Sequence, residues 1–184
     1  MSQLIYKIEF FSDWHMGTGL SSGSDADLLV IKDKTGLPFV PGKTLKGLFK
    51  NAAKDLLEAR YLDIDFIREI FGLDSKEHGN NKSIPGKTFF SNAELSNKTK
   101  QLLKGKTSLI YRRISSTAIG ENGQAKEHSL RTLEVVVPLT LYAAIENIPE
   151  SIDLNKLIDC MKMIKRIGTG RNRGFGRCEF SALP

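Results

Sequence analysis

The sequence predicts an α+β fold with an antiparallel sheet, and the pattern of its apolar residues indicates this. Apolar side chains alternate along residues 4–11, which is the period of a strand. Two stretches, 44–60 and 154–164, instead place apolar residues three and four positions apart, as an amphipathic helix does. The order strand, helix, strands, helix, strand matches a ferredoxin-like core, which is therefore the expected architecture.

The remaining elements follow from turn signals and shorter apolar runs. Asp33-Lys34-Thr35-Gly36 is a good hairpin turn, and it separates short strands expected at 28–31 and 37–40. A second helix is expected at 63–71, before a polar loop at 74–86 that is rich in Ser, Lys, Gly and Asn. Further strands are expected at 88–94, 108–114, 132–146 and 178–180.

Residues 114–131 are expected to form a β-hairpin arm that projects from the domain. The arm is centred on Asn122-Gly123, which is the strongest short hairpin signal. Tyr111, Arg112 and Arg113 lead into it and could stack on or grip a nucleic acid. Packing of Tyr111 within the sheet explains the same pattern equally well.

Length and charge limit the class of protein. The 184 residues are expected to form a single domain, 1–184, with a substantial core. The formal net charge of +6 favours a polyanionic partner, although a merely basic protein has the same balance. Cys160 and Cys178 are the only cysteines and are not spaced as zinc ligands, so a cytoplasmic location is expected. No apolar run approaches the length of a membrane span, and no membrane partner is expected.

The first helix is expected to carry one basic face. Thr44 is its predicted N-cap, because a threonine hydroxyl can accept a hydrogen bond from a free amide one turn into the helix. Lys43, Lys46, Lys50 and Lys54 recur every three or four residues and so share a face. The helix dipole adds positive potential beside Lys43 and Lys46, which favours phosphate there.

The same segment contains Gly-Lys-Thr, the end of a nucleotide-binding P-loop. That motif requires four residues between its glycines, but Gly36 and Gly42 enclose five, and Pro41 precedes the second glycine. A second Pro-Gly-Lys-Thr, beginning at Pro85, leads into a predicted strand and not a helix. An ATPase is therefore not expected.

The last predicted helix is followed by a segment in which glycines alternate with arginines. Glycine lets the backbone approach a ligand closely, and the guanidinium fork suits phosphate oxygens. Taken alone, the segment could equally be a flexible loop with solvated arginines. Packed beside the lysine face of the first helix, it is expected to form a cradle for an RNA backbone. The residues concerned are Gly168, Gly170, Arg171, Arg173 and Gly174.

Together these motifs resemble the RAMP superfamily of CRISPR proteins. Pro-Gly-x-x-Leu-Lys-Gly, from Pro41 to Gly47, follows a hairpin, and Gly-x-Gly-x-x-x-Gly-x-Gly, from Gly168 to Gly176, precedes the last strand. The closest likeness is to the repeating backbone subunits of type III effector complexes of the Csm and Cmr kinds. The resemblance implies copies of the chain stacked with other subunits along a guide RNA that pairs with a complementary target RNA. It also implies that the arm, 114–131, is a thumb that wedges into this duplex.

The resemblance further implies a cleavage site. In this family, the loop before the strand that leads into the Pro-Gly turn carries an aspartate that cuts the target RNA. Asp27 matches that position, with Asp25 as the alternative. A loop carboxylate can hold Mg²⁺ or Mn²⁺, or can orient a ribose 2′-hydroxyl for attack on the adjacent phosphate. The alternative is that Asp27 is an ordinary turn residue and the subunit is purely architectural.

Other RAMP proteins imply a different activity. They are endoribonucleases that process guide-RNA precursors, and several use a histidine as general acid or base. His15 follows the first strand, where such a residue could act. His15 is predicted to contact the guide RNA or to have a structural role, and the processing nuclease is the alternative function.

Overall fold

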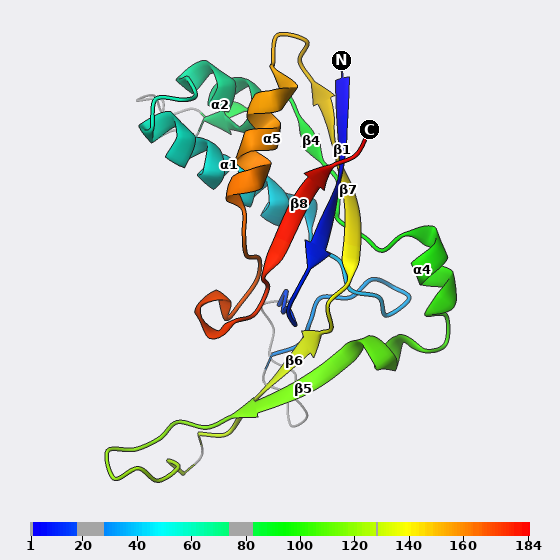
Figure 1. The fold of residues 1–184 in the computed structure, drawn as a ribbon, viewed down its shortest axis with the longest axis vertical. Coiled ribbons are helices and arrows are strands. Elements are labelled where there is room, and N and C mark those ends of the chain that lie inside the picture. Colours follow the sequence, from blue (N-terminus) through cyan, green and yellow to red (C-terminus); the bar gives the residue numbers. More distant parts are fainter. Residues whose placement is uncertain (1, 18–27, 74–82, 128) are drawn as a thin grey trace.

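The computed structural model describes residues 2–17, 28–73, 83–127 and 129–184, and shows an α+β body with a long arm (Figure 1). The helices are α1 (Gly42–Glu58), α2 (Ile64–Phe71), α4 (Asn97–Leu102) and α5 (Leu154–Met163), with 3-10 turns η1 (Thr107–Ile110) and η2 (Arg171–Arg173). The strands are β1 (Ser2–Phe10), β2 (Gly72–Leu73), β3 (Ile84–Pro85), β4 (Phe89–Phe90), β5 (Tyr111–Ser116), β6 (Arg131–Val136), β7 (Thr140–Ile148) and β8 (Cys178–Ala182). None of the described helices is long and apolar enough to cross a membrane.

The central sheet has the strand order β4-β7-β1-β8, and every neighbouring pair is antiparallel. When the arm and the separate two-stranded sheet of β2 and β3 are left out, these are the second, third, first and last strands of a chain in which α1 follows β1 and α5 precedes β8. That order is ferredoxin-like, so the predicted fold class is confirmed. Helices α1 and α5 cover one face of the sheet (Figure 1), and the opposite face exposes Ile5, Phe89 and Tyr142.

An aromatic cluster joins α1 to the sheet. The ring of Tyr6 in β1 lies 5.7 Å from that of Phe49 in α1 and 5.9 Å from that of Phe180 in β8. Phe90 of β4 completes the cluster, with its ring 5.5 Å from Phe49. All of these residues are buried, and for Tyr6 the alternating pattern of β1 predicts this.

The start of α1 differs from the prediction. The helix begins at Gly42 with Pro41 as N-cap, and no side chain caps it from within, so the assignment of Thr44 as N-cap was wrong. The amide of Gly42 instead donates to the side-chain oxygen of Asn92 at 2.9 Å. A Cβ on Gly42 would lie 2.0 Å from the main-chain oxygen of Phe90, so only glycine fits against this neighbour. A contact from a distant segment thus replaces the local cap.

Several predicted strands are shorter than expected. The stretch at 132–146 divides around Pro138 into β6, which belongs to the arm, and β7, which belongs to the central sheet. The first part of 108–114 is the 3-10 turn η1, and α4 was not predicted at all. The segments 28–31 and 37–40 form only isolated bridges, but the turn between them is confirmed by a 3.1 Å hydrogen bond from Gly36 N to Asp33 O.

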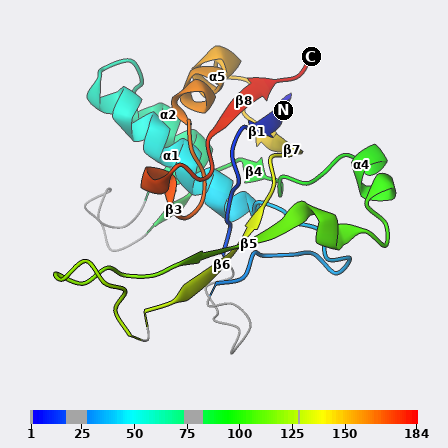
Figure 2. The same ribbon diagram turned by 60° about the horizontal axis from the view of Figure 1, so that its bottom comes forward.

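The predicted arm is present. Strands β5 and β6 pair in register from Tyr111 with Val136 to Ser116 with Arg131. The arm leaves the body below the end of the central sheet (Figures 1 and 2). Its root is held by Trp14, whose main chain exchanges hydrogen bonds of 2.9 and 2.8 Å with Val136 and whose ring stacks on Phe10.

Candidate nucleic-acid interface

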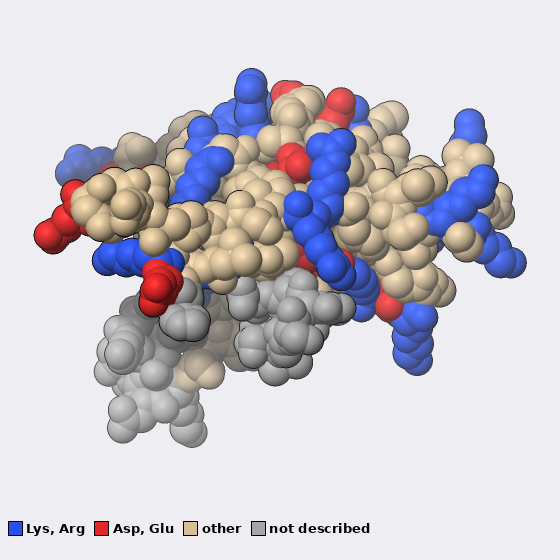
Figure 3. Space-filling model, turned by 90° about the horizontal axis from the view of Figure 1, so that it is seen from below, with Lys and Arg blue, Asp and Glu red and all other residues tan. Residues whose placement is uncertain are grey.

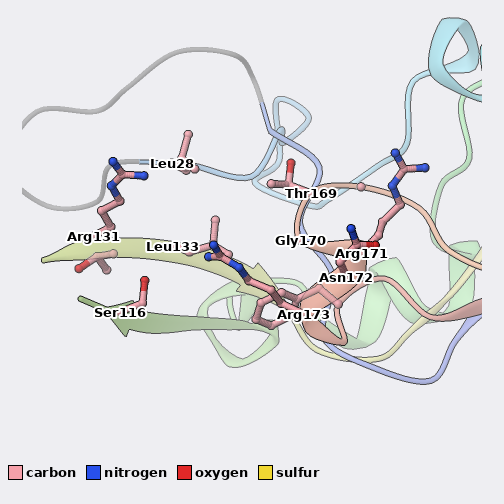
Figure 4. A pocket seen from close by; sticks show the side chains of 12 residues that line it. Leu28, Ser116, Arg131, Leu133, Thr169, Gly170, Arg171, Asn172 and Arg173 are labelled. Carbon is pink, nitrogen blue, oxygen red and sulfur yellow. The ribbon is translucent and has the colours of Figure 1, made fainter. Parts of the chain in front are cut away.

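A groove of about 720 Å³ separates the arm from the glycine-rich segment near the C-terminus (Figure 4). One wall is formed by the arm, through Ser116 and the start of β6, and the other by η2 and its flanking glycines. Arg131 enters from the arm and Arg173 from η2. The groove therefore has an arginine on each wall, which suits a polyanionic strand.

The glycines shape this segment mainly through contacts within the protein. A Cβ on Gly168 would lie 2.2 Å from the main-chain oxygen of His15, and one on Gly176 would lie 1.8 Å from that of Ile167. Gly170 is packed under the ring of Phe175. At Gly174, in contrast, no atom lies within 4 Å of an added Cβ, and only its φ of +89° favours glycine. Most of these glycines are therefore required by packing before any ligand is considered.

His15 lies inside the molecule. The residue is 1% exposed, and Nδ1 lies 2.7 Å from the main-chain oxygen of Glu134 in β6. Its own main-chain oxygen accepts a 3.0 Å hydrogen bond from the amide of Thr169. This geometry favours the structural role that was predicted for His15 over direct contact with RNA.

Glu134 was missed by sequence reasoning, although it connects strand β6 of the groove wall to the segment 28–32. Its carboxylate accepts hydrogen bonds from the amide of Val30 at 3.0 Å and from Lys32 Nζ at 2.8 Å. Its amide donates to the main-chain oxygen of Leu28. Lys32 also lies 4.0 Å from the centroid of the Tyr111 ring, so Tyr111 packs within the protein. A glutamate at an inward position of a strand was the only available signal.

The predicted cleavage residues cannot be placed in this geometry. Asp27 and Asp25 lie outside the described residues, whereas Leu28, the next residue, lines the groove and pairs with Leu133 of β6. Over the described ranges, no group of three or more His, Cys, Asp or Glu side chains is arranged to hold a metal ion. The assignments of Asp27 as catalytic residue and of Mg²⁺ or Mn²⁺ as cofactor therefore remain predictions.

The arginines of the segment point in different directions. Arg173 points into the groove beside Leu133, whereas the side chain of Arg171, which also lines the groove, extends away from the arm (Figure 4). Arg171 lines a second hollow of about 370 Å³, whose other wall is α1, through Leu48, Asn51 and Asp55. The glycine–arginine segment does therefore lie beside the first helix.

The lysines of α1 lie on a different face from the one that adjoins Arg171. With about 3.6 residues per turn, the row formed by Lys43, Lys46, Lys50 and Lys54 is displaced by roughly a third of a turn from Asn51 and Asp55. Lys43 is exposed and the others are partly buried. Desolvation, and then the charge of Lys50, lower the pKa of Lys46. The lysines and arginines thus flank α1 on two sides and do not form one continuous wall.

The arm root adds further basic residues. Arg112 lies 3.4 Å from Asp13, whose main-chain oxygen accepts a hydrogen bond from the amide of Gly176. Arg112 and Arg113 together line a third hollow with Tyr111 and Lys32. Seen from below, Lys and Arg side chains recur across the whole width of this side of the molecule (Figure 3).

Fold and groove define a class: a ferredoxin-like domain with a basic groove between a β-hairpin arm and a glycine–arginine loop. A sequence model of the RAMP superfamily matches residues 7–179, and the chain belongs to this superfamily. No curated protein sequence matches the chain.

Solved structures share the fold. A chain of a type III-B Cmr-beta complex in the apo state has a TM-score of 0.69 at 14% identity, over 98% of this chain and 97% of that one. A chain of a type III-B Cmr-beta complex bound to cognate target RNA has a TM-score of 0.74 at 12% identity, over 99% and 97%. At this identity, the likeness concerns the fold.

Proposed function

We propose that this protein is a guide-RNA-binding backbone subunit of a type III CRISPR effector complex. The observation that carries the proposal is the groove between arm and glycine–arginine loop, with Arg131 on one wall and Arg173 on the other. Membership of the RAMP superfamily and the fold shared with chains of Cmr-beta complexes support it. The partners in this proposal are guide RNA, complementary target RNA, copies of the chain and other subunits.

Binding depends mainly on phosphates. The groove presents the guanidinium groups of Arg131 and Arg173, and guanidinium contacts to phosphates carry little sequence information. Affinity is therefore expected to fall steeply with salt and to vary little with guide sequence. In this proposal the arm is the thumb that separates stretches of the guide–target duplex.

We also propose that Asp27 promotes cleavage of bound target RNA. A ribose 2′-oxygen attacks the adjacent phosphorus, forming a P–O2′ bond while the P–O5′ bond breaks. The 2′-proton passes to a base, and the departing 5′-oxygen takes up a proton. Asp27 would orient the 2′-hydroxyl, and Mg²⁺ or Mn²⁺, when bound there, supplies charge stabilisation. What supports this proposal is that Leu28, the residue after Asp27 in the sequence, lines the groove.

The alternative, a nuclease that processes guide precursors with His15, has less structural support. A general acid or base must reach the substrate within hydrogen-bond distance. The imidazole of His15 is enclosed and already bonded to Glu134 O. The groove is equally compatible with a purely architectural subunit that has no nuclease activity. The experiment below distinguishes this alternative from a cleaving subunit.

The test is reconstitution with guide RNA and complementary RNA, with Mg²⁺ or with EDTA. Wild type is compared with Asp27→Ala, Asp25→Ala and His15→Ala, and thermal unfolding confirms that each variant is folded. Magnesium-dependent cutting that Asp27→Ala abolishes supports the proposal. Unchanged cutting by Asp27→Ala refutes the catalytic assignment. Assembly without any cutting identifies an architectural subunit, and metal-independent cutting of a guide precursor that requires His15 identifies the processing enzyme.

A further inference from the structure

An exposed phenylalanine lies at the end of the central sheet next to the glycine–arginine loop. Phe11 directly follows β1 and is 47% exposed. Its amide donates a 2.8 Å hydrogen bond to the main-chain oxygen of Arg177, and Arg177 forms a β-bridge with Arg166. Phe11, Arg177 and Arg166 therefore lie side by side on three neighbouring segments and on one face.

This row lines a hollow of about 370 Å³. The other lining residues are Lys165, Cys178 and Glu179, so three cations and one carboxylate surround the phenyl ring. The guanidinium carbon of Arg177 lies 5.9 Å from the centroid of the Phe11 ring. An exposed aromatic face within a group of cations is the combination that binds single-stranded nucleic acid, because the ring stacks on a base while the cations bind phosphates.

The hollow continues into the surface already described. Lys165 and Arg166 also line the hollow between α1 and Arg171. The Nη1 of Arg166 donates a hydrogen bond to the main-chain oxygen of Arg171. A strand that leaves the glycine–arginine loop on this side therefore passes Lys165 and Arg166 on its way to Phe11, with Asp55 of α1 on the opposite wall of the hollow.

The rest of the same sheet face has a different character. Glu9 and Glu179 lie opposite each other on β1 and β8, and Lys7 is paired with Glu9. Phe89, the other exposed phenylalanine on this face, is 55% exposed but lies opposite Glu146. Exposure of an aromatic ring is thus common to both ends of the face, but three cations line the hollow at Phe11, whereas the strand partner of Phe89 is a carboxylate.

We propose that Phe11 is a stacking platform for an unpaired RNA base, with Arg166, Arg177 and Lys165 binding the adjoining phosphates. This inference rests on the proposed RNA-binding function and adds a site outside the groove. Stacking is tolerant of base identity, so the subsite extends the bound strand without adding a sequence requirement.

The experiment measures binding of a labelled single-stranded oligoadenylate by fluorescence anisotropy. Phe11→Ala and Phe11→Leu are expected to bind about tenfold more weakly than wild type, because both lack the aromatic face. The matched control Phe89→Ala is expected to bind as wild type does. Phe11→Trp is expected to retain the affinity of wild type. RNA is expected to quench the fluorescence of the new tryptophan, whereas the fluorescence of the buried Trp14 is expected to change little.

A second probe separates stacking from charge. On an abasic ribose-phosphate strand of the same length, Phe11→Ala is expected to bind as wild type does, while Arg166→Ala remains weaker on both strands. Wild-type affinity of Phe11→Ala for oligoadenylate, or an equal loss on the abasic strand, overturns the stacking site. If the stacking site is overturned but Arg171→Ala and Arg173→Ala weaken binding, the proposed RNA-binding function is retained without the Phe11 site. If wild type binds neither strand, both proposals fail.

Discussion

Nδ1 of His15 lies 2.7 Å from the main-chain oxygen of Glu134, although the two residues are 119 positions apart in the sequence. The main-chain oxygen of His15 also accepts a hydrogen bond from the amide of Thr169. One buried residue after β1 thus holds both the arm and the glycine–arginine loop. Because the groove lies between these two elements, the contacts of His15 help to set its width.

Replacing Glu134 with Gln is expected to lower the free energy of unfolding by about 1–3 kcal/mol, because the buried carboxylate serves both Val30 N and Lys32. The matched control is Glu9→Gln, which breaks the ion pair between Glu9 and Lys7. The side chain of Lys7 is 33% exposed and that of Glu9 is 45% exposed. That change should cost less than about 1 kcal/mol. Urea unfolding of both variants measures the difference. Equal effects would show that Glu134 does not anchor the wall.

Gly168→Ala and Gly174→Ala separate close packing from backbone conformation. Their φ values are similar, +92° and +89°, so alanine costs about 1–2 kcal/mol at either position through conformation alone. At Gly168 the new methyl would also meet the main-chain oxygen of His15 at 2.2 Å. Gly168→Ala is therefore expected to be the more destabilising by at least about 2 kcal/mol in urea unfolding. Similar losses at both positions would contradict the close contact.

Arg131→Ala and Arg173→Ala are expected to weaken RNA binding and to make it less dependent on salt. Each phosphate contact contributes about 0.7 to the slope of log affinity against log salt on a single strand. Each variant should therefore reduce the slope by roughly that amount. The control is Lys104→Ala, because Lys104 follows α4, on the opposite side of the body from the glycine–arginine loop (Figures 1 and 2). Unchanged slopes for both arginine variants would exclude the groove as the RNA site.

The lysine row on α1 tests how far the bound strand extends. Lys43, the exposed member, lies around the helix from the Arg171 hollow. If RNA passes over α1, Lys43→Ala should reduce the salt slope as the groove arginines do. An unchanged slope would show that RNA does not contact this face of α1 and would contradict the predicted role of Lys43. The same titration measures both outcomes.

The two cysteines should report unfolding. Burial raises the pKa of the Cys160 and Cys178 thiols to about 12. At a pH below the ordinary thiol pKa, near 8.5, both thiols are neutral in the folded and in the unfolded protein. Their burial then contributes fully to the free energy of unfolding. That contribution is lost as the pH rises toward 12. At pH 8, a thiol reagent should therefore label the native protein slowly and the urea-unfolded protein fully. Rapid labelling of the native protein would contradict this burial.

Elements with strong local patterns were predictable from sequence. Strand β1 and helices α1 and α5 have clear periods, and the Asn-Gly signal placed the arm correctly. The boundaries depended on remote partners. Asn92 fixes the first turn of α1, and Pro138 divides one apolar run between two sheets. The short segments at 28–31 and 37–40 gain only isolated bridges, and some of these join residues far apart in the chain, Leu28 to Leu133 and Val40 to Ala93.

The sequence by itself determined the fold class, the arm and the positions of the glycine–arginine and Pro-Gly motifs, because these depend on periodicity and on residues adjacent in the chain. Only the tertiary structure decided which of those residues meet. It enclosed His15, made Glu134 an anchor, turned Arg173 toward the groove and Arg171 away from the arm, and placed the α1 lysines on another face. Such juxtapositions arise from contacts between segments far apart in the chain, and no local pattern encodes them.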